Sequence, residues 1–412
     1  VPVQPGKTAR MKILFIVPYT PNLVRVRPYN LIRALAARGN QVTVATLATG
    51  PADEADVRGL EAIGVRVLHA PLPRWRWMLN CALALPTRSP LQAAYCWQPA
   101  LMRALRQAVA TEGFDAVHVE HLRGVRFGLG LLDGGAAPVV WDSVDCITHL
   151  FRQASRQARQ PIKKAVTRFE LSRTAPYEGW LAGQFARVLV TSPIDRKAFM
   201  ELAPQYSDRL VVLPNGVDLD YFQPDASVIR TQDELVISGK MSYHANVAMV
   251  LHLVNDILPL VWAERPDVSL NVVGKDPPRE LLALAENPRV RVTGSVPDLR
   301  PYLRRAAIAL APITYGAGIQ NKVLEALACA TPVVASPQAV SALQIRAGEE
   351  ILVAEQPDDF ARHVLSLLAD PVLRRRLGEG GRRFVERQHS WNAAAASLEE
   401  IYRQARQNPS AA

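Results

Sequence analysis

Short apolar runs alternate with helix-like stretches along nearly the whole chain, and this alternation constrains the fold more than any other feature. Strand, helix and strand in repeated succession predict a parallel, doubly wound α/β sheet covered by helices. The runs form two series, one before residue 214 and one after it. They lie at 12–17, 41–46, 65–68, 115–119, 138–141, 187–191 and 210–213, and then at 235–238, 269–273, 290–293, 308–311 and 332–335.

The length of the chain and the break between the two series predict two main domains. A chain of 412 residues is long enough for two or three domains. The segment from Pro214 to Pro224 lies between the series and carries turn residues at both ends, as a linker does. We therefore expect an N-terminal domain over 11–213 and a C-terminal domain over 214–389, followed by an amphipathic helix over 390–407.

The segment from Tyr315 to Ser336 predicts a glycine loop, a helix and a buried strand. Gly316 and Gly318 leave room for a bulky anion against the backbone. The helix that follows would point its free N–H groups at that loop, which is the geometry of a phosphate site. Lys322 adds a positive charge in the first turn, and Glu325 lies on the same face, where it can accept hydrogen bonds from sugar hydroxyls. These parts suit a nucleotide diphosphate, although the two side chains can also be read as a surface ion pair.

Two glycine–lysine pairs follow other strands of the second series. Gly239-Lys240 comes directly after 235–238, and Gly274-Lys275 comes directly after 269–273. Because ligands of open parallel sheets bind beyond the carboxyl ends of the strands, these loops are expected to face the same ligand as the glycine loop. The other interpretation is that each lysine is only a solvated surface charge.

The segment from Tyr315 to Ser336 resembles the C-terminal signature of the family-4 glycosyltransferases. Its run Gly-x-Gly-Ile-x-x-Lys-Val-Leu-Glu-Ala resembles a subgroup associated with bacterial exopolysaccharide clusters. Glu325 matches the second Glu of the signature, whereas Ala317 stands where the first Glu is expected. The Asn-Gly-Val-Asp segment at 215–218 and the tail from Ser390 also resemble parts of this family.

The resemblance implies a fold and an activity. The fold would be GT-B, with two Rossmann-like parallel-sheet domains facing a central cleft and the last helix crossing back to the first domain. The activity would be a retaining transfer of a sugar, with the donor bound by the C-terminal domain and the acceptor by the N-terminal domain. Enzymes of this fold generally stabilise the leaving diphosphate with cationic side chains and helix N-termini, so we expect neither a metal nor a cofactor.

The resemblance also assigns roles to individual residues of the second half. Lys322 and then Lys240 are the expected catalytic cations, and Glu325 would bind the ribose hydroxyls. Many relatives carry a further Lys after the pair at 239–240, but His244 and Asn246 lie near that place here. The remaining donor-binding positions are expected at Gly239, Lys275, Gly316, Ala317, Gly318 and Ile319.

The first half supplies weaker candidates for an acceptor site. The run at 114–121 ends a strand with Glu120 and His121, either of which could orient the sugar or handle the acceptor proton. Asp142 follows another strand end, where turn capping is an equal interpretation. Arg25 and Arg27 occupy the loop after the first strand and could grip a phosphate of the acceptor or donor, or could be surface charges.

Composition indicates an acidic partner. The formal net charge is +10, and arginine and lysine gather between residues 152 and 173. The stretch 71–99 is rich in Pro, Arg and Trp, which favours a membrane interface, although a connecting loop with buried tryptophans is the alternative. No apolar run is long enough to span a membrane and residues 1–10 lack the apolar core of a signal peptide, so we expect a cytoplasmic protein that contacts the anionic inner face of the membrane.

These observations predict a glycosyltransferase of cell-surface polysaccharide synthesis. It would move a sugar from a UDP- or GDP-linked donor to a glycan or polyprenyl-linked acceptor. A nucleotide-sugar epimerase of the same fold is one alternative, since it would need no acceptor. A non-catalytic scaffold that binds sugar nucleotides is another. No nucleic-acid recognition module is visible, so nucleic acid is not an expected partner.

Overall fold

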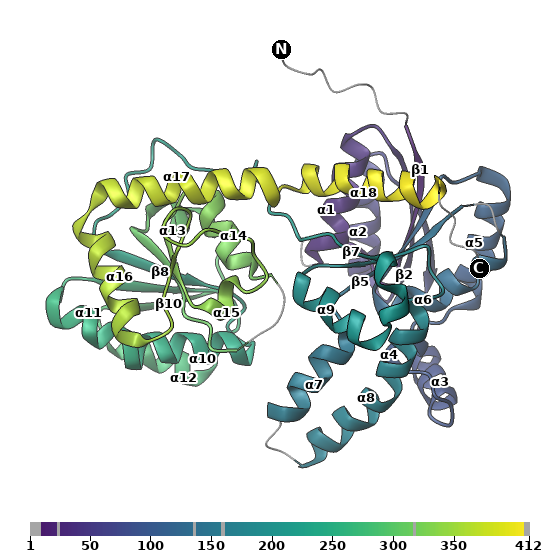
Figure 1. Cartoon of the computed structure of the whole chain (residues 1–412), viewed down its shortest axis with the longest axis horizontal. Helices are drawn as coiled ribbons and strands as arrows, with labels where there is room; N and C mark the ends of the chain where they lie inside the picture. The colour runs from purple at the N-terminus through teal and green to yellow at the C-terminus, as the bar shows by residue number, and fades with distance from the viewer. Residues whose placement is uncertain (1–9, 23–24, 135–136, 158–160, 316–318, 408–412) are drawn as a thin grey trace. The chain divides into compact units, whose positions relative to one another are not determined.

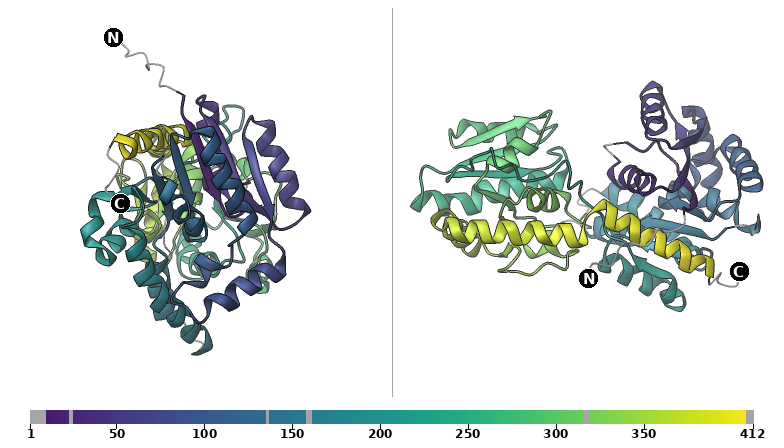
Figure 2. Two further views of the ribbon diagram at one scale, coloured as in Figure 1. Left: turned by 90° about the vertical axis from the view of Figure 1, so that its right-hand side faces the viewer. Right: turned by 90° about the horizontal axis from the view of Figure 1, so that it is seen from above.

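The computed structural model describes residues 10–22, 25–134, 137–157, 161–315 and 319–407. The chain divides into two compact units, and each is treated by itself (Figure 1). Unit 1 comprises the chain up to Pro214 together with the segment from Ala394 onward, and unit 2 runs from Asn215 to Ala393. Helices cover both faces of the sheet in each unit (Figures 1 and 2).

Unit 1 is built on a parallel sheet of seven strands in the order β3-β2-β1-β4-β5-β6-β7. Most of β1 is buried, which explains why this strand is a nearly continuous apolar run. All of β4 is buried too, including its polar residues His118 and Glu120. The strands are β1 Lys12–Val17, β2 Gln41–Ala48, β3 Arg66–Pro71, β4 Ala116–Glu120, β5 Val139–Val144, β6 Arg187–Val190 and β7 Leu210–Val212.

Two stretches of unit 1 that carry no predicted strand are largely helical. The stretch 71–99, for which a connecting loop was one interpretation, contains two helices, and the basic stretch between residues 152 and 173 lies on two further helices. Pro161 begins the second of these, at a position where the missing N–H costs nothing. The helices are α1 Val26–Ala37, α2 Pro51–Ala62, α3 Arg74–Ala84, α4 Leu91–Ala94, α5 Pro99–Glu112, α6 His121–Leu129, α7 Ile147–Gln157, α8 Pro161–Leu181 and α9 Pro193–Leu202.

Unit 2 is built on a parallel sheet of six strands in the order β10-β9-β8-β11-β12-β13. The strands are β8 Glu234–Ser238, β9 Ser269–Val273, β10 Val290–Gly294, β11 Ile308–Ala311, β12 Val333–Ala335 and β13 Leu352–Val353. The helices are α10 His244–His252, α11 Leu258–Glu264, α12 Arg279–Leu282, α13 Arg300–Arg305, α14 Asn321–Ala328, α15 Pro337–Val340, α16 Pro357–Ala369 and α17 Pro371–Gln388.

The strand orders confirm the predicted doubly wound sheets and locate one switch point in each. The order of connection reverses between β1 and β4 in unit 1 and between β8 and β11 in unit 2. Loops on either side of such a point diverge to opposite faces of the sheet and leave a crevice beyond the carboxyl ends of the strands. Functional side chains are therefore expected after β1 and β4, and after β8 and β11.

One helical stretch of unit 2, His244–Glu264, is long and apolar enough by composition to cross a membrane. Half of it is buried inside the protein, and Met249, Leu253 and Ile257 belong to the hydrophobic core of the unit. Its apolar character is that of a core helix.

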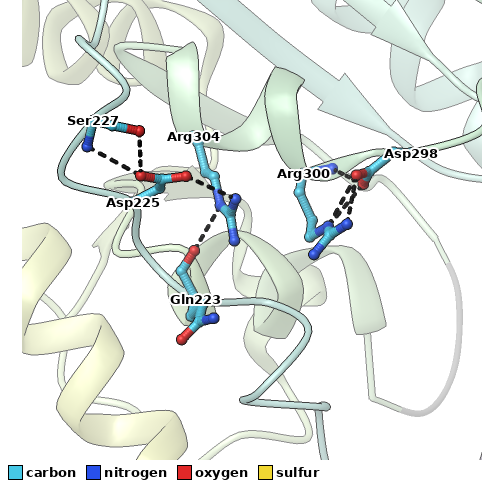
Figure 3. A network of polar contacts seen from close by, with 6 residues as sticks. All are labelled: Gln223, Asp225, Ser227, Asp298, Arg300 and Arg304. Carbon is cyan, nitrogen blue, oxygen red and sulfur yellow. Dashed lines mark hydrogen bonds and ion pairs between the residues drawn. The ribbon is translucent and has the colours of Figure 1, made fainter.

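Polar contacts fix the segment that follows the boundary between the units to α13 (Figure 3). The Arg304 guanidinium donates to the Gln223 carbonyl oxygen at 2.7 Å and to the Asp225 carboxylate at 3.3 Å. Ser227 donates to the same carboxylate through its N–H and its hydroxyl. Arg300 of α13 contacts Asp298, which precedes the helix, at 2.7 Å. Most of these groups are exposed to solvent, which screens their charges, so the contacts order the segment and add little to the stability of the fold.

The last helix, α18 (Trp391–Gln407), begins in unit 2 and continues into unit 1. Within unit 1, Glu399 of α18 accepts hydrogen bonds from Arg38 at 2.9 Å and from Asn40 at 2.7 Å. The hydrogen bond to Glu399 raises the pKa of Arg38 against the effect of burial. Burial likewise opposes the ionisation of Glu399, but the hydrogen bonds from Arg38 and Asn40 outweigh it and lower the pKa of this carboxyl.

Candidate functional site

Two glycines of unit 2 bring the loops after β8 and β9 into direct contact. A Cβ on Gly274 would lie 1.7 Å from the carbonyl oxygen of Gly239, and a Cβ on Gly239 would lie 2.8 Å from Nδ2 of Asn246. Both glycines have positive φ angles that other residues rarely adopt. The close approach therefore requires glycine at both positions, and it forms the floor beside the switch point.

Lys322 of α14 lies over this floor and is held by Asn246 of α10. The Lys322 Nζ donates to Asn246 Oδ1 at 2.8 Å, and Asn246 Nδ2 donates to the Lys240 carbonyl oxygen at 2.9 Å. A Cβ on Gly239 would lie 3.3 Å from Cε of Lys322. Asn246 is buried and links the loop after β8 to the first turn of α14. An ammonium group held in this way is preorganised for an anion at the switch point.

Burial shifts the pKa values of both ionisable groups on this face of α14. Burial lowers the pKa of Lys322 to about 8, and the Glu325 carboxylate only partly opposes it. Burial raises the pKa of Glu325 to about 7, with Lys322 opposing. No hydrogen bond joins the two side chains among the contacts that the structure describes. The pair is therefore poorly described as a solvated surface ion pair, because both groups are penalised for being charged.

The other predicted donor-site residues fall into three groups. The Lys240 and Lys275 side chains are exposed, and their loops are joined because Met241 N donates to the Lys275 carbonyl oxygen at 3.0 Å. Ile319 is half-buried and packs against the core of unit 2. Gly316, Ala317 and Gly318 lie outside the described residues, so the predictions made for them remain predictions.

An aromatic wall that the sequence analysis missed stands at the start of α10. His244 Nδ1 lies 3.0 Å from the Tyr315 hydroxyl oxygen, and the two rings are stacked with centroids 5.5 Å apart. Tyr243 lies beside His244, with ring centroids 4.6 Å apart. His244 and Tyr315 are 71 residues apart in the sequence, so no local pattern indicates that their rings meet.

In unit 1, polar side chains gather at the switch point between β1 and β4 and are almost fully buried. Arg27, which follows β1, contacts Asp142 Oδ2 through Nε at 2.9 Å and through a terminal nitrogen at 2.8 Å. His118 Nε2 of β4 lies 3.6 Å from the same carboxylate and 3.7 Å from Glu120 Oε2. Tyr402 of α18 bonds His118 Nδ1 at 2.9 Å. No local pattern of the sequence indicates that Tyr402 belongs to this cluster, because it lies 284 residues from its partner.

The charges of this buried cluster compensate one another. Burial opposes the ionisation of Asp142, but Arg27 and His118 outweigh it and lower the pKa of the carboxyl. Burial likewise lowers the pKa of His118, and the two carboxylates reverse this and raise it. The pKa of Glu120 is raised by burial, with His118 opposing. Glu120 Oε2 and His118 Nε2 each have no hydrogen-bond partner among the described residues, so the Glu120 carboxylate still has an oxygen that can accept a hydrogen bond from a ligand.

Three residues of the cluster are of the types that bind metal ions. One ligand atom each of His118, Glu120 and Asp142 lie within 4.8 Å of one another. However, the Arg27 guanidinium already contacts the Asp142 oxygen that would bind a cation. A divalent ion there would face a buried positive charge, so these residues fit an ion-pair network better than a metal centre.

Arg25 is exposed and His121 is half-buried, whereas Arg27 is buried. Burial lowers the pKa of His121 to about 3, so its imidazole is neutral near pH 7. Its φ of 60° lies in the left-handed region, which costs a non-glycine residue free energy and is common at functional sites. Arg25 is exposed and stacks over the Tyr19 ring at 4.5 Å. The expectation that Arg27 grips a phosphate needs correction, because its guanidinium is buried and bound to Asp142.

Two doubly wound parallel sheets with polar side chains at their switch points place the protein in the GT-B class of glycosyltransferases. The chain belongs to the family-4 glycosyltransferases. The family model described as Glycosyltransferase Family 4 matches residues 24–221, and the model described as Glycosyl transferases group 1 matches residues 232–370.

Curated relatives are similar along nearly the whole chain. The D-inositol 3-phosphate glycosyltransferase of Xylanimonas cellulosilytica is 28% identical, with 91% of this chain and 90% of the relative covered. The phosphatidyl-myo-inositol mannosyltransferase of Mycobacterium tuberculosis is 24% identical, with 95% and 96% covered. The lipopolysaccharide core mannosyltransferase LpcC of Rhizobium leguminosarum bv. viciae is 25% identical over 59% of this chain and 72% of the relative.

Solved structures agree with this fold at low sequence identity. Anabaena HepE in complex with UDP and glucose has a TM-score of 0.68 and is 14% identical, with 96% of this chain and 100% of that chain covered. Sucrose-phosphate synthase from Thermosynechococcus elongatus has a TM-score of 0.66 and is 20% identical, with 96% and 99% covered. The solved structures show the fold alone, whereas the family models and the curated relatives show that the protein is a glycosyltransferase, as predicted.

Proposed function

We propose that this glycosyltransferase moves a sugar from a UDP- or GDP-linked donor to a glycan or lipid-linked glycan acceptor. The proposal rests on Lys322, whose ammonium group Asn246 holds over the Gly239–Gly274 floor at the switch point of unit 2. A phosphate-sized anion at that place meets a cation, the backbone of two glycine loops and the first turn of α14. Glycosyl diphosphates have this chemistry in their leaving group.

In the proposed reaction, the glycosidic bond to the diphosphate breaks and negative charge grows on the diphosphate oxygens. Lys322 stabilises that charge, and Lys240 and Lys275 are placed on loops from which they can add to it. We propose that these groups suffice without a metal and that the anomeric configuration is kept. Glu325 accepts hydrogen bonds from the ribose hydroxyls, and the exposed Tyr243 ring beside His244 offers an apolar face to the sugar or base.

Unit 1 would bind the acceptor through the groups that keep free capacity. Glu120 Oε2 and the neutral His121 imidazole can take or orient the proton of the acceptor hydroxyl. Arg25 is the exposed cation available to a phosphate of the acceptor. Relatives named for phosphatidyl-myo-inositol and for lipopolysaccharide core favour a phosphate-bearing or lipid-linked acceptor in cell-surface polysaccharide synthesis, which we place in the cytoplasm at the inner membrane face.

The proposal is tested by incubating the protein with labelled UDP-glucose and GDP-mannose, with and without a polyprenyl-phosphate-linked sugar. We expect nucleotide release that depends on the acceptor, with one nucleotide preferred, and the rate should persist in EDTA. Conversion of the sugar without acceptor would indicate an epimerase, and binding without turnover would indicate a scaffold. Loss of activity in EDTA that Mg²⁺ restores would contradict the metal-free step.

The affinity for the nucleoside diphosphate should fall as pH rises through about 8. Lys322 has a pKa of about 8, so the free protein loses this positive charge above that pH, whereas a diphosphate stays fully ionised. We expect the Kd of the preferred nucleotide to rise up to about tenfold per pH unit above the pKa. Isothermal titration calorimetry between pH 7 and pH 9 measures this, and Lys322→Arg, whose charge persists, is the matched control. A flat profile for the wild-type protein would remove Lys322 from the site.

A further inference from the structure

Helix α3 carries its apolar side chains on the solvent side. Trp75, Met78, Leu79 and Leu83 follow the three- and four-residue spacing of one helix face. They are exposed to 62%, 60%, 42% and 63% respectively. A surface helix of a globular protein normally turns such a face toward the core, and contiguous exposed apolar patches mark interaction sites.

The side of α3 that contacts the protein is held by polar groups. The buried Asn80 donates through Nδ2 to the carbonyl oxygens of Tyr95 at 2.9 Å and Trp97 at 2.8 Å. Beyond the end of the helix, Arg173 of α8 donates to the carbonyl oxygens of Leu85 and Thr87. The helix is thus fixed by directional bonds with its apolar face outward, and this orientation does not depend on burying that face.

Helix α8 extends the same surface. Arg173 joins its middle to the end of α3, and Figure 1 shows the two helices side by side. On α8, Val166 is 59% exposed and Phe169 is 45% exposed, and the Arg173 guanidinium stacks on the Phe169 ring at 4.3 Å. We call Trp75, Met78, Leu79, Leu83, Val166 and Phe169 the α3–α8 patch.

The surroundings of the α3–α8 patch are basic. Residues 62–111 contain arginines and neither Asp nor Glu. Arg74 and Arg88 are exposed at the two ends of α3, and Arg168 is exposed on α8. A hollow of about 360 Å³ beside the patch is lined by Arg76 and Arg126 together with Leu79, Leu83 and Trp97. Apolar and indole side chains surrounded by arginines complement a partner whose interior is apolar and whose outer layer is anionic.

We propose that the α3–α8 patch docks unit 1 onto an anionic lipid bilayer. The Trp, Met and Leu side chains would enter the boundary between headgroups and acyl chains, where tryptophan is favoured. The arginines would pair with lipid phosphates, and those of the hollow would take a headgroup. This charge complementarity favours a bilayer over an apolar protein partner. The inference does not depend on the proposed transfer reaction, because membrane binding requires neither donor nor sugar acceptor.

The test is sedimentation of the full-length protein with vesicles. We expect the protein to bind vesicles of equal parts phosphatidylcholine and phosphatidylglycerol, and to bind pure phosphatidylcholine much more weakly. The triple variant Trp75→Ser, Met78→Gln and Leu83→Gln should lower the partition coefficient roughly tenfold or more, since interfacial binding scales with buried apolar area. Because these side chains are exposed, circular dichroism and the melting temperature should remain those of the wild type.

The matched control removes exposed apolar side chains from unit 2. Ile229, Leu282 and Val372 are exposed to 88%, 50% and 76%, and replacing all three by glutamine should leave vesicle binding unchanged. Equal losses in both triple variants would overturn the proposal, as would a wild-type protein that ignores anionic vesicles. Light scattering in the absence of lipid measures the oligomeric state of the wild type and of the α3 variant. A wild-type dimer that becomes monomeric in the α3 variant and binds no vesicle would show that a second copy covers the patch.

Discussion

Replacing Lys322 with alanine should reduce turnover by about two to three orders of magnitude, the loss expected when one preorganised group at a developing charge is removed. The ammonium group is held by Asn246 beside the glycine floor of unit 2. Its burial already lowers its pKa, so the folded protein bears a cost for placing a cation there. A diphosphate whose charge grows as the sugar leaves would use that cation most strongly in the transition state.

The measurement is kcat and KM with the preferred donor, together with a thermal melt. Lys197→Ala removes an exposed lysine of unit 1 and should leave both constants unchanged. Asn246→Ala should give a smaller loss than Lys322→Ala, because the ammonium group would remain but would no longer be fixed. A Lys322→Ala variant with near-normal kcat and an unchanged melting temperature would show that the diphosphate is bound elsewhere.

Replacing Asp142 with alanine should destabilise unit 1 by about 3–5 kcal/mol, the range measured when one partner of a buried ion pair is removed. Arg27 is only 6% exposed, and its two contacts with Asp142 at 2.8 and 2.9 Å supply the compensating negative charge. His118 would lose a carboxylate neighbour in the same step. Glu120 cannot neutralise both Arg27 and His118, because burial raises its pKa and opposes its ionisation.

Urea denaturation followed by fluorescence reports this effect, because Trp141 is fully buried and adjacent in sequence. Asp208→Ala removes an exposed carboxylate of unit 1 and should shift the unfolding midpoint little. The double variant Arg27→Met with Asp142→Leu should recover most of the loss, because an apolar pair leaves no charge unpaired. If Asp142→Ala alone unfolds at the wild-type midpoint, water must enter the cluster and solvate Arg27.

The sequence predicted which loops of unit 2 come together, but it assigned roles to their residues only by resemblance. Lys322, Gly239 and Gly274 were predicted from loops that follow strands, and the parallel sheets bring these loops to one edge. That Asn246 would hold Lys322 was not visible, because a bond over 76 residues has no local signal. The prediction for Arg27 was wrong for the same reason, because its partner is also distant in the sequence. Its place in a loop suggested a ligand, whereas its partner on β5 makes it part of the core.

The pattern of apolar runs by itself determined the two parallel sheets, because strand burial and helix amphipathicity are local properties that each segment carries in its own composition. The glycine–lysine loops and the signature around Lys322 were likewise local and led to the family. Only the tertiary structure decided which polar groups are charged, paired or exposed. Ionisation depends on the dielectric and on neighbours that the fold supplies from distant segments, as with Tyr402 beside His118. The same holds for α3: its sequence does not show which face is buried, whereas the structure shows Asn80 bonded to the carbonyl oxygens of Tyr95 and Trp97 and the apolar face exposed.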